Sequence, residues 1–159
     1  MEPFVGPSAA SDRDAVLAAI ERSHAEPGDF GRFVIEVEQD GAWRRAGALG
    51  FHVASRHSRI AKCEGLAVHP DFRGRRLADE AARLLQRELF DVLGYHRLEL
   101  ECYGFNERAM RHAERVGFVR EGVKRQAYWR HGRWNDGVLF GLVREDLEGR
   151  TGGGEHASP

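Results

Sequence analysis

The chain has 159 residues and a hydrophobic content of 42%, which suits one globular domain with a sizeable core. Its 24 Lys and Arg residues nearly balance 25 Asp and Glu residues. This balance argues against a dedicated nucleic-acid-binding protein, because such proteins carry a basic excess. No apolar run is long enough to cross a bilayer, and Met1-Glu2-Pro3 does not open a signal peptide. We therefore expect a cytoplasmic protein with neither a nucleic-acid nor a membrane partner.

The composition divides the chain into three parts. Residues 1–10 carry Pro and Gly without periodicity and are expected to form a loose arm, residues 11–148 the domain, and the Gly-rich residues 149–159 a disordered tail. Cys63 and Cys102 lack CxxC spacing, so we expect two reduced, buried thiols. The eight histidines include no HExxH pattern, so no metal site is expected.

The first half of the chain predicts a helix followed by three strands. Ser11-Asp12 is a helix N-cap signal before apolar residues at helical spacing. Residues 33–37 alternate as a strand, and Asp40-Gly41 predicts a hairpin to a second strand over residues 43–53. After a polar turn, residues 61–68 predict a third strand.

The second half alternates between helices and strands. A helical period covers residues 78–93 and ends at Gly94, and Asn106 predicts the N-cap of another helix that ends at Gly117. Further strands are predicted at residues 98–102, 118–128 and 137–143. Because strands precede and follow each long helix, the pattern predicts an α/β or α+β domain with a mixed sheet.

The most informative stretch is the junction at residues 73–78, where a hydrophobic strand passes through an Arg- and Gly-rich turn into a helix. The first turn of such a helix presents free N–H groups and the positive end of the helix dipole, which favour a phosphate group. Three arginines add positive charge, and Gly74 allows close approach to the backbone. Taken alone, the same pattern also describes an ordinary helix start with solvated arginines.

Two sequence motifs, found in the expected order, indicate a function for this junction. Val68-His69-Pro70 followed by residues 73–78 resembles motif A of the GNAT superfamily of acyl-CoA N-acetyltransferases, whose signature is [Q/R]-x-x-G-x-[G/A]. The segment from Asn106 to Gly117-Phe118 resembles motif B of the same family. Residues 119–122 and Asn135-Asp136 are similar to the branch that acetylates ribosomal-protein alanine N-termini. The resemblance covers residues 30–147.

The resemblance implies a central mixed, mostly antiparallel sheet flanked by helices, with acetyl-CoA as co-substrate and no metal. It implies an acceptor that is an amine-bearing small molecule or a protein N-terminus, and a homodimer is possible. In this family two central strands splay apart to admit the thioester, and backbone amides bind the pantetheine and pyrophosphate. The cofactor contacts carried over on this basis are Leu66, Ala67, Val68, Arg73, Gly74, Arg75, Arg76, Leu77, Ala78 and Asn106.

A catalytic base is expected because an amine with a pKa of about 10 is protonated at pH 7 and must lose a proton before attack. Glu64 is the only carboxylate on the strand at residues 61–68. Strict alternation would place Glu64 on one face with Leu66 and Val68. We interpret Glu64 as the candidate base; an ion-paired surface glutamate is the alternative. Glu101 and Tyr128 are weaker candidates for lining the acceptor pocket.

Two positions depart from the family pattern. Arg76 replaces the middle glycine of the signature, and Ala113 replaces the tyrosine that in many members protonates the departing thiolate. These departures leave open a catalytically silent module that binds acyl-CoA. An arginine-rich RNA contact at residues 73–76 is a third interpretation, disfavoured by the near-neutral charge and by the lack of an aromatic platform.

Overall fold

The computed structural model describes residues 13–151 of the chain. The predicted arm at residues 1–10, the Ser11-Asp12 cap and most of the predicted tail lie outside the described residues. The elements in chain order are α1 (Arg13–Ala25), β1 (Phe30–Gln39), β2 (Ala42–Ser55), β3 (Ile60–Val68), the 3-10 turn η1 (Pro70–Phe72), α2 (Leu77–Arg87), the π-helical turn η2 (Glu88–Val92), β4 (Arg97–Tyr103), α3 (Glu107–Arg115), β5 (Val119–Arg130), β6 (Arg133–Val143) and α4 (Arg144–Thr151).

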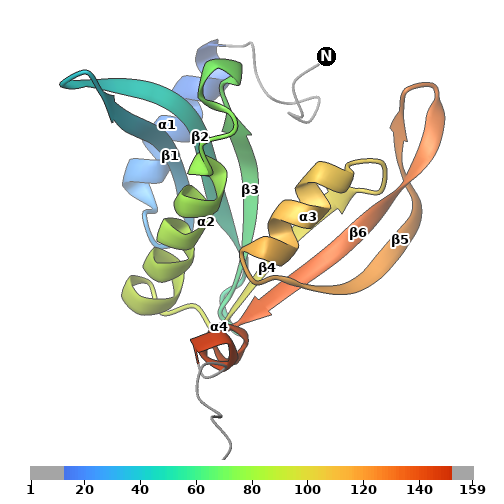
Figure 1. Cartoon of the computed structure of the whole chain (residues 1–159). Helices are drawn as coiled ribbons and strands as arrows, with labels where there is room; N and C mark the ends of the chain where they lie inside the picture. Colours follow the sequence, from blue (N-terminus) through green and yellow to red (C-terminus); the bar gives the residue numbers. More distant parts are fainter. Residues whose placement is uncertain (1–12, 152–159) are drawn as a thin grey trace, which may run out of the picture.

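The six strands form one sheet in the order β1-β2-β3-β4-β6-β5. All neighbours are antiparallel except β3 and β4, which are parallel. This confirms the mixed, mostly antiparallel sheet. Helix α2 makes the crossover between the two parallel strands, and α2 and α3 lie over the same face of the sheet (Figure 1).

The core lies between the sheet and these two helices. Residues of α2 at helical spacing, such as Ala81 and Leu85, pack with strand residues such as Phe51 and Leu98. Phe51 and Leu98 are fully buried. The periodic apolar residues in the sequence therefore lie on the helix and sheet faces that pack against each other. Burial of these side chains is the main favourable contribution to the stability of the fold.

The predicted hairpin turn at Asp40-Gly41 and the turn that joins β5 to β6 have the same type of backbone. Asp40 and Gly41 have φ values of 53° and 74°, and His131 and Gly132 have 53° and 70°. Positive φ at both central residues gives a turn whose twist matches that of the strands.

Two helical details were not predicted. The single helix expected over residues 78–93 is α2 followed by the π-helical turn η2, before Gly94 with φ 71°. Helix α4 overlaps the predicted tail by three residues. It forms because Leu147 packs against the core and the Asp146 carboxylate accepts a 2.9 Å bond from the Val143 N–H, contacts that no local period reveals.

Candidate active site

The central feature of the sheet is an opening between β3 and β4. The two strands are paired only at Ile60↔Arg97, Ala61↔Leu98 and Lys62↔Glu99, whereas β3 stays paired to β2 as far as Val68. Beyond Lys62 the two parallel strands therefore diverge, as Figure 1 shows. The divergence expected at residues 66–68 thus begins at Cys63, and one backbone edge of β3 is left available for a ligand.

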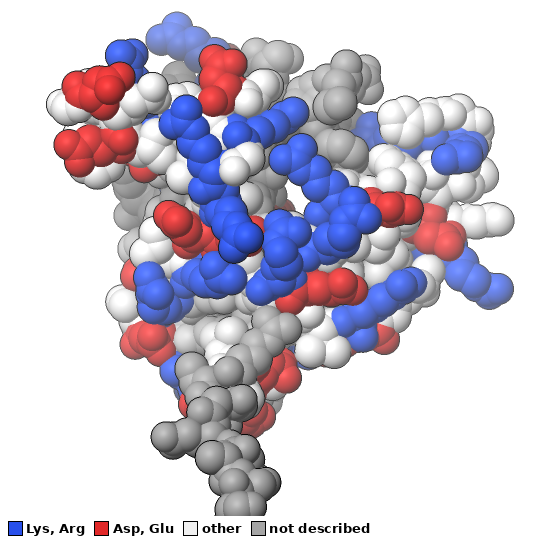
Figure 2. All heavy atoms as spheres, in the orientation of Figure 1, with Lys and Arg blue, Asp and Glu red and all other residues white. Residues whose placement is uncertain are grey.

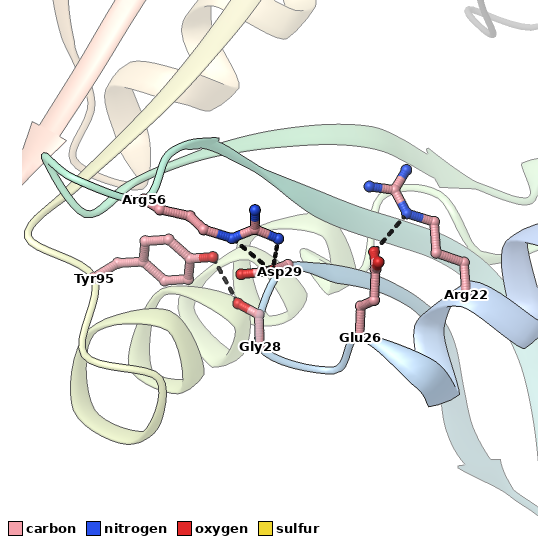
Figure 3. A network of polar contacts seen from close by, with 6 residues as sticks. All are labelled: Arg22, Glu26, Gly28, Asp29, Arg56 and Tyr95. Carbon is pink, nitrogen blue, oxygen red and sulfur yellow. Dashed lines mark hydrogen bonds and ion pairs between the residues drawn. The ribbon is translucent and has the colours of Figure 1, made fainter.

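The closed end of this opening is fixed by a polar network (Figure 3). The Tyr95 hydroxyl donates to the Gly28 carbonyl over 2.6 Å, and the Arg56 guanidinium bonds the Asp29 carboxylate, with Nε 2.9 Å from Oδ2. These contacts join the loop after α1, the turn before β3 and the segment before β4. The end at which β3 and β4 remain paired is therefore anchored, and the two strands separate away from it.

A β-bulge interrupts β3 beside the opening. Its register with β2 passes from Gly50↔Glu64 to Ala48↔Ala67, so β3 has one residue more than β2 in this interval. Gly65 has φ 65°, a conformation that side-chain-bearing residues rarely adopt.

The bulge changes which side chains share a face. Leu66 and Val68 pack against the core together with Cys63. Glu64 instead contacts polar side chains of the sheet face that α2 and α3 do not cover. The prediction that Glu64, Leu66 and Val68 share one face is therefore wrong, because strict alternation does not continue through a bulge.

Glu64 takes part in an ion-paired group that crosses three strands. Its carboxylate lies 3.6 Å from Arg32 Nη2 on β1 and 3.2 Å from His52 Nδ1 on β2. Arg32 reaches it across Gly50, where an added Cβ would lie 3.0 Å from Arg32 Cδ and 2.6 Å from the Gly31 carbonyl oxygen. The Glu64 side chain keeps 34% of its surface exposed, so a ligand on this face can reach it.

Glu101 forms a second polar group on the β4 side of the opening. Its carboxylate accepts bonds from the Tyr128 hydroxyl at 2.5 Å and from Lys124 Nζ at 2.9 Å, and lies 3.5 Å from Lys62 Nζ. Burial raises the pKa of Glu101, but the bonds from Lys124 and Tyr128 and the charges of Lys124 and Lys62 together hold the pKa below its ordinary value. Burial and Glu101 together raise the pKa of Tyr128 to about 12. A side chain at Gly137 would overlap both partners, so this glycine of β6 permits the contact.

The turn between β3 and α2 is open and exposed. Gly74 has φ 80° with nothing within 4 Å of an added Cβ, and Arg76 has a left-handed φ of 58° at the N-cap of α2 without a side-chain cap. Arg73 Nε donates to the Val68 carbonyl over 3.3 Å and so ties the turn to the end of β3. In the part of the chain that the structure describes, the first amide after Arg73 to bond a backbone carbonyl is that of Asp79. Residues 74–78 thus present amides to solvent.

Positive charge surrounds this turn. Arg73, Arg75 and Arg76 are all exposed, and Figure 2 shows Lys and Arg side chains gathered on the face that carries α2 and α3. Exposed amides at a helix start, with arginines beside them, match the requirements of a pyrophosphate.

The start of α3 completes this face of the site. The Asn106 side chain accepts a 3.0 Å bond from the Ala109 N–H, which confirms the predicted N-cap. Ala113, on the same helix, is 1% exposed and packs in the core. No hydroxyl is available at the position where many members of the family have a tyrosine.

The predicted site residues thus fall into two groups. The first group is the unpaired part of β3 at residues 66–68, the turn at residues 73–78 that follows β3, and Asn106, which follows β4. The second is Glu64, which lies on the sheet face that α2 and α3 do not cover. Sequence reasoning missed the partners Arg32, His52, Lys62 and Lys124. Their contacts depend on strand register, for which the sequence carries no local signal.

Three further observations bear on the chemistry. Within residues 13–151 no group of three or more His, Cys, Asp or Glu side chains could hold a metal ion, and none of the helices there combines the length and apolar character needed to span a membrane. Cys63 and Cys102 are free thiols. Burial raises the pKa of Cys63 to about 12 and that of Cys102 to about 11, so neither is a ready nucleophile at neutral pH.

An opened pair of parallel strands that leads to a helix start with exposed amides is the arrangement of acyl-CoA-dependent acetyltransferase folds. Residues 1–119 match the acetyltransferase (GNAT) domain family, and the chain belongs to that family.

Individual relatives agree with this assignment. The SPbeta prophage-derived uncharacterized N-acetyltransferase YokL of Bacillus subtilis is 35% identical over 83 residues, which cover 52% of this chain and 47% of that protein. The putative ribosomal N-acetyltransferase YdaF of the same organism is 27% identical over 103 residues, covering 65% and 56%. The matches thus span about half the length of these curated relatives.

The solved structures show the same fold. Spermidine N-acetyltransferase from Vibrio cholerae, determined in complex with CoA and spermine, superposes with a TM-score of 0.72 at 21% identity. The superposition covers 83% of this chain and 76% of that chain.

Proposed function

We propose that the protein is an acetyl-CoA-dependent N-acetyltransferase that moves the acetyl group to a primary amine. The observation that carries the proposal is the opening between β3 and β4 that leads to the exposed amides of residues 74–78. In this proposal the free edge of β3 at Leu66, Ala67 and Val68 bonds the pantetheine arm. The turn binds the pyrophosphate, and Asn106 contributes at the start of α3.

The reaction is direct attack of the amine nitrogen on the thioester carbonyl. The C–N bond forms, the C–S bond breaks, and the sulfur leaves as a thiolate that takes up a proton. A thiol with a pKa near 8.5 is a tolerable leaving group, so the absence of a tyrosine at Ala113 does not prevent turnover. Backbone amides of β3 at the opening would stabilise the charge that develops on the carbonyl oxygen.

Glu64 is the proposed base, acting directly or through a water molecule. Its half-buried carboxylate lies on the face opposite to α2 and α3, from which an acceptor can approach. Arg32 and His52 hold it in place. Glu101 is less suited to accept a proton, because Lys124 and Lys62 offset its charge and the Tyr128 hydroxyl donates a hydrogen bond to it. In this proposal Glu101 and Tyr128 line the acceptor pocket.

The acceptor is proposed to be a small-molecule amine or a protein N-terminus. The similarity to a spermidine acetyltransferase supports the first, and the similarity to a putative ribosomal N-acetyltransferase supports the second. We also propose a cytoplasmic location, in keeping with two free thiols. A homodimer is a further part of the proposal, which light scattering would measure.

The test is release of free thiol from acetyl-CoA in the presence of a panel of amines that includes polyamines and peptides with free N-termini. Amine-dependent thiol release with formation of the acetylated amine supports the enzyme. A rise in melting temperature with acetyl-CoA, but no thiol release with any amine, would instead support the silent acyl-CoA-binding module.

A further inference from the structure

Asp79 is a buried carboxylate that the proposed chemistry does not use. It is the third residue of α2 and is only 4% exposed. Its side chain reaches α3, where Oδ1 lies 2.8 Å from His112 Nδ1 and 3.0 Å from Arg115 Nη2, and Oδ2 lies 3.1 Å from Arg115 Nε. The buried Asp79 carboxylate therefore makes three polar contacts with α3.

An acidic residue in the first turn of a helix is common, because it complements the helix dipole, but this carboxylate is buried. It lies in the first turn of α2, directly after the exposed turn at residues 73–76, where a negative charge would repel a bound phosphate. Arg115 compensates that charge. Only the Asp79 end of this pair is buried, because 55% of the Arg115 side chain is exposed. Burial of a carboxylate costs free energy that its contacts must offset.

The contacts hold together the two helices that carry the proposed acetyl-CoA contacts. The turn at residues 73–76 leads into α2, and Asn106 begins α3. Asp79 joins α2 to α3 at the end nearest the turn. At the other end of α2, Gln86 Nε2 donates to the Val116 carbonyl over 2.9 Å. The amino end of α2 has no side-chain cap of its own, and the Asp79 carboxylate bonds it to His112 and Arg115 of α3.

We propose that Asp79, bonded to His112 and Arg115, is a positioning residue that aims the first-turn amides of α2 and thereby sets the affinity for acetyl-CoA. The inference rests on the proposed function.

The substitution Asp79→Asn distinguishes two effects of Asp79 on CoA binding: positioning of the α2 amides and electrostatic repulsion of the phosphate groups. It keeps the shape of the side chain but weakens its bonds to α3. If Asp79 acts only as a charge near phosphate, its removal strengthens CoA binding. If Asp79 positions the helix, CoA affinity falls and KM for acetyl-CoA rises, each on the order of ten- to a hundredfold, as for other small misplacements of binding groups. With acetyl-CoA saturating, kcat and KM for the amine stay near wild type, since the lost interaction is uniform binding.

A milder pair of variants covers the case in which Asp79→Asn does not fold. His112→Leu removes one bond to Asp79 and keeps Arg115, so it weakens CoA binding in the same direction. His112→Asn places an amide N–H close to the position of Nδ1 and restores the affinity. The matched control is Asp91→Asn, because it breaks another ion pair, with Arg144 Nη1 at 2.7 Å, near the far end of the same helical segment. This control leaves CoA affinity unchanged.

CoA affinity is measured by isothermal titration calorimetry on the full chain, with thermal unfolding to confirm folding. Equal or tighter CoA binding by folded Asp79→Asn, or by folded His112→Leu, overturns the positioning role while leaving the proposed function intact. Absence of CoA binding by the wild-type protein overturns both.

Discussion

Arg76 adopts the left-handed conformation at the N-cap of α2, with φ 58° and ψ 19°. This explains why the family signature has glycine at that position, because a side chain makes this conformation costly. We expect Arg76→Gly to raise the free energy of unfolding by about 0.5–1 kcal/mol, since relief of strain exceeds the added freedom of the unfolded chain.

Urea unfolding measures this change. The matched control is Arg73→Gly, because Arg73 has an ordinary φ of −67° and its replacement lowers stability. CoA affinity stays close to wild type in Arg76→Gly if the backbone amide provides the contact. A loss of stability in Arg76→Gly would contradict the role of backbone strain at this residue.

The role proposed for Glu64 predicts a pH-dependent loss in Glu64→Gln. General-base assistance typically contributes about 10²–10⁴ in rate, so kcat at pH 7 should fall by that order with CoA affinity unchanged. The loss should shrink as pH rises, because more of the amine is already neutral.

Steady-state kinetics between pH 7 and 10 measure this effect, with Glu99→Gln as the control. Glu99 is ion-paired to Arg97 at 2.9 Å on β4 and has no proposed role. A Glu64→Gln enzyme with kcat near wild type at pH 7 would show that another group, or bulk water, takes the proton.

At the scale of residues, the sequence indicates which residues are candidates for the site. It does not indicate which face of the sheet their side chains occupy or which residues they contact. Glu64 stands out as the one carboxylate on its strand, but its face depends on the bulge at Gly65, which the pairing with β2 defines. The partners of Asp79 lie 33 and 36 residues along the chain. Such distant contacts follow from the packing of α2 against α3, and no local period encodes them.

At the scale of elements, the turn before α2 depends on Gly74. Its φ of 80° disfavours any side chain, although the surrounding space is open. We expect Gly74→Val to lower CoA affinity, because the branched side chain crowds the phosphate approach and shifts the amides of the turn.

A matched control separates this effect from general strain. Gly132, in the hairpin between β5 and β6, also has a positive φ of 70° and nothing within 4 Å of an added Cβ. Gly132→Val should therefore cost comparable stability while CoA affinity, measured by calorimetry, stays at the wild-type value. Equal affinities in Gly74→Val and wild type would remove the turn from the proposed binding site.

Elements with a strong period were predicted closely. The helices around residues 78–93 and 107–116 and the strands appear near their expected bounds, because each buries one face against a neighbour. The π-helical turn η2 and helix α4 were missed. Both depend on tertiary contacts, such as the bond from Arg144 Nη2 to the Phe90 carbonyl at 2.8 Å, that link the two segments.

At the scale of the whole molecule, the opening of the sheet followed from the family resemblance and not from any pattern in the strands. A second feature was not predicted at all. Glycines on strands allow polar side chains of the flanking strands to meet above them: Gly50 lies beneath the Arg32–Glu64 ion pair, and Gly137 beneath the hydrogen bond from Tyr128 to Glu101. In the sequence alone these glycines only indicate positions that weaken a strand, because glycine adds backbone entropy and has no side chain to pack. Their role in these contacts becomes visible once the strand order is known.

Acid stability is the last whole-molecule property that the structure predicts. Hydrogen bonds from Arg115 outweigh burial and, with His112, lower the pKa of Asp79 from 3.8 to about 2. A carboxyl with a lowered pKa contributes stability that is complete above its unfolded value of 3.8 and is lost as pH falls toward 2, roughly 2 kcal/mol in this case. Burial lowers the pKa of His112 despite Asp79, so stability also declines as pH falls below 6.5.

Three other carboxyls with lowered pKa values, Asp29, Glu101 and Glu121, act in the same direction, so the wild-type curve alone does not isolate Asp79. The contribution of Asp79 is isolated by the difference in unfolding free energy between the wild type and Asp79→Asn. We expect this difference to be largest above pH 4 and to shrink toward pH 2, because protonation removes from the wild type the charge that the variant already lacks. Urea unfolding at a series of pH values measures it, and a difference that stays constant over this range would show that the Asp79 charge does not stabilise the fold.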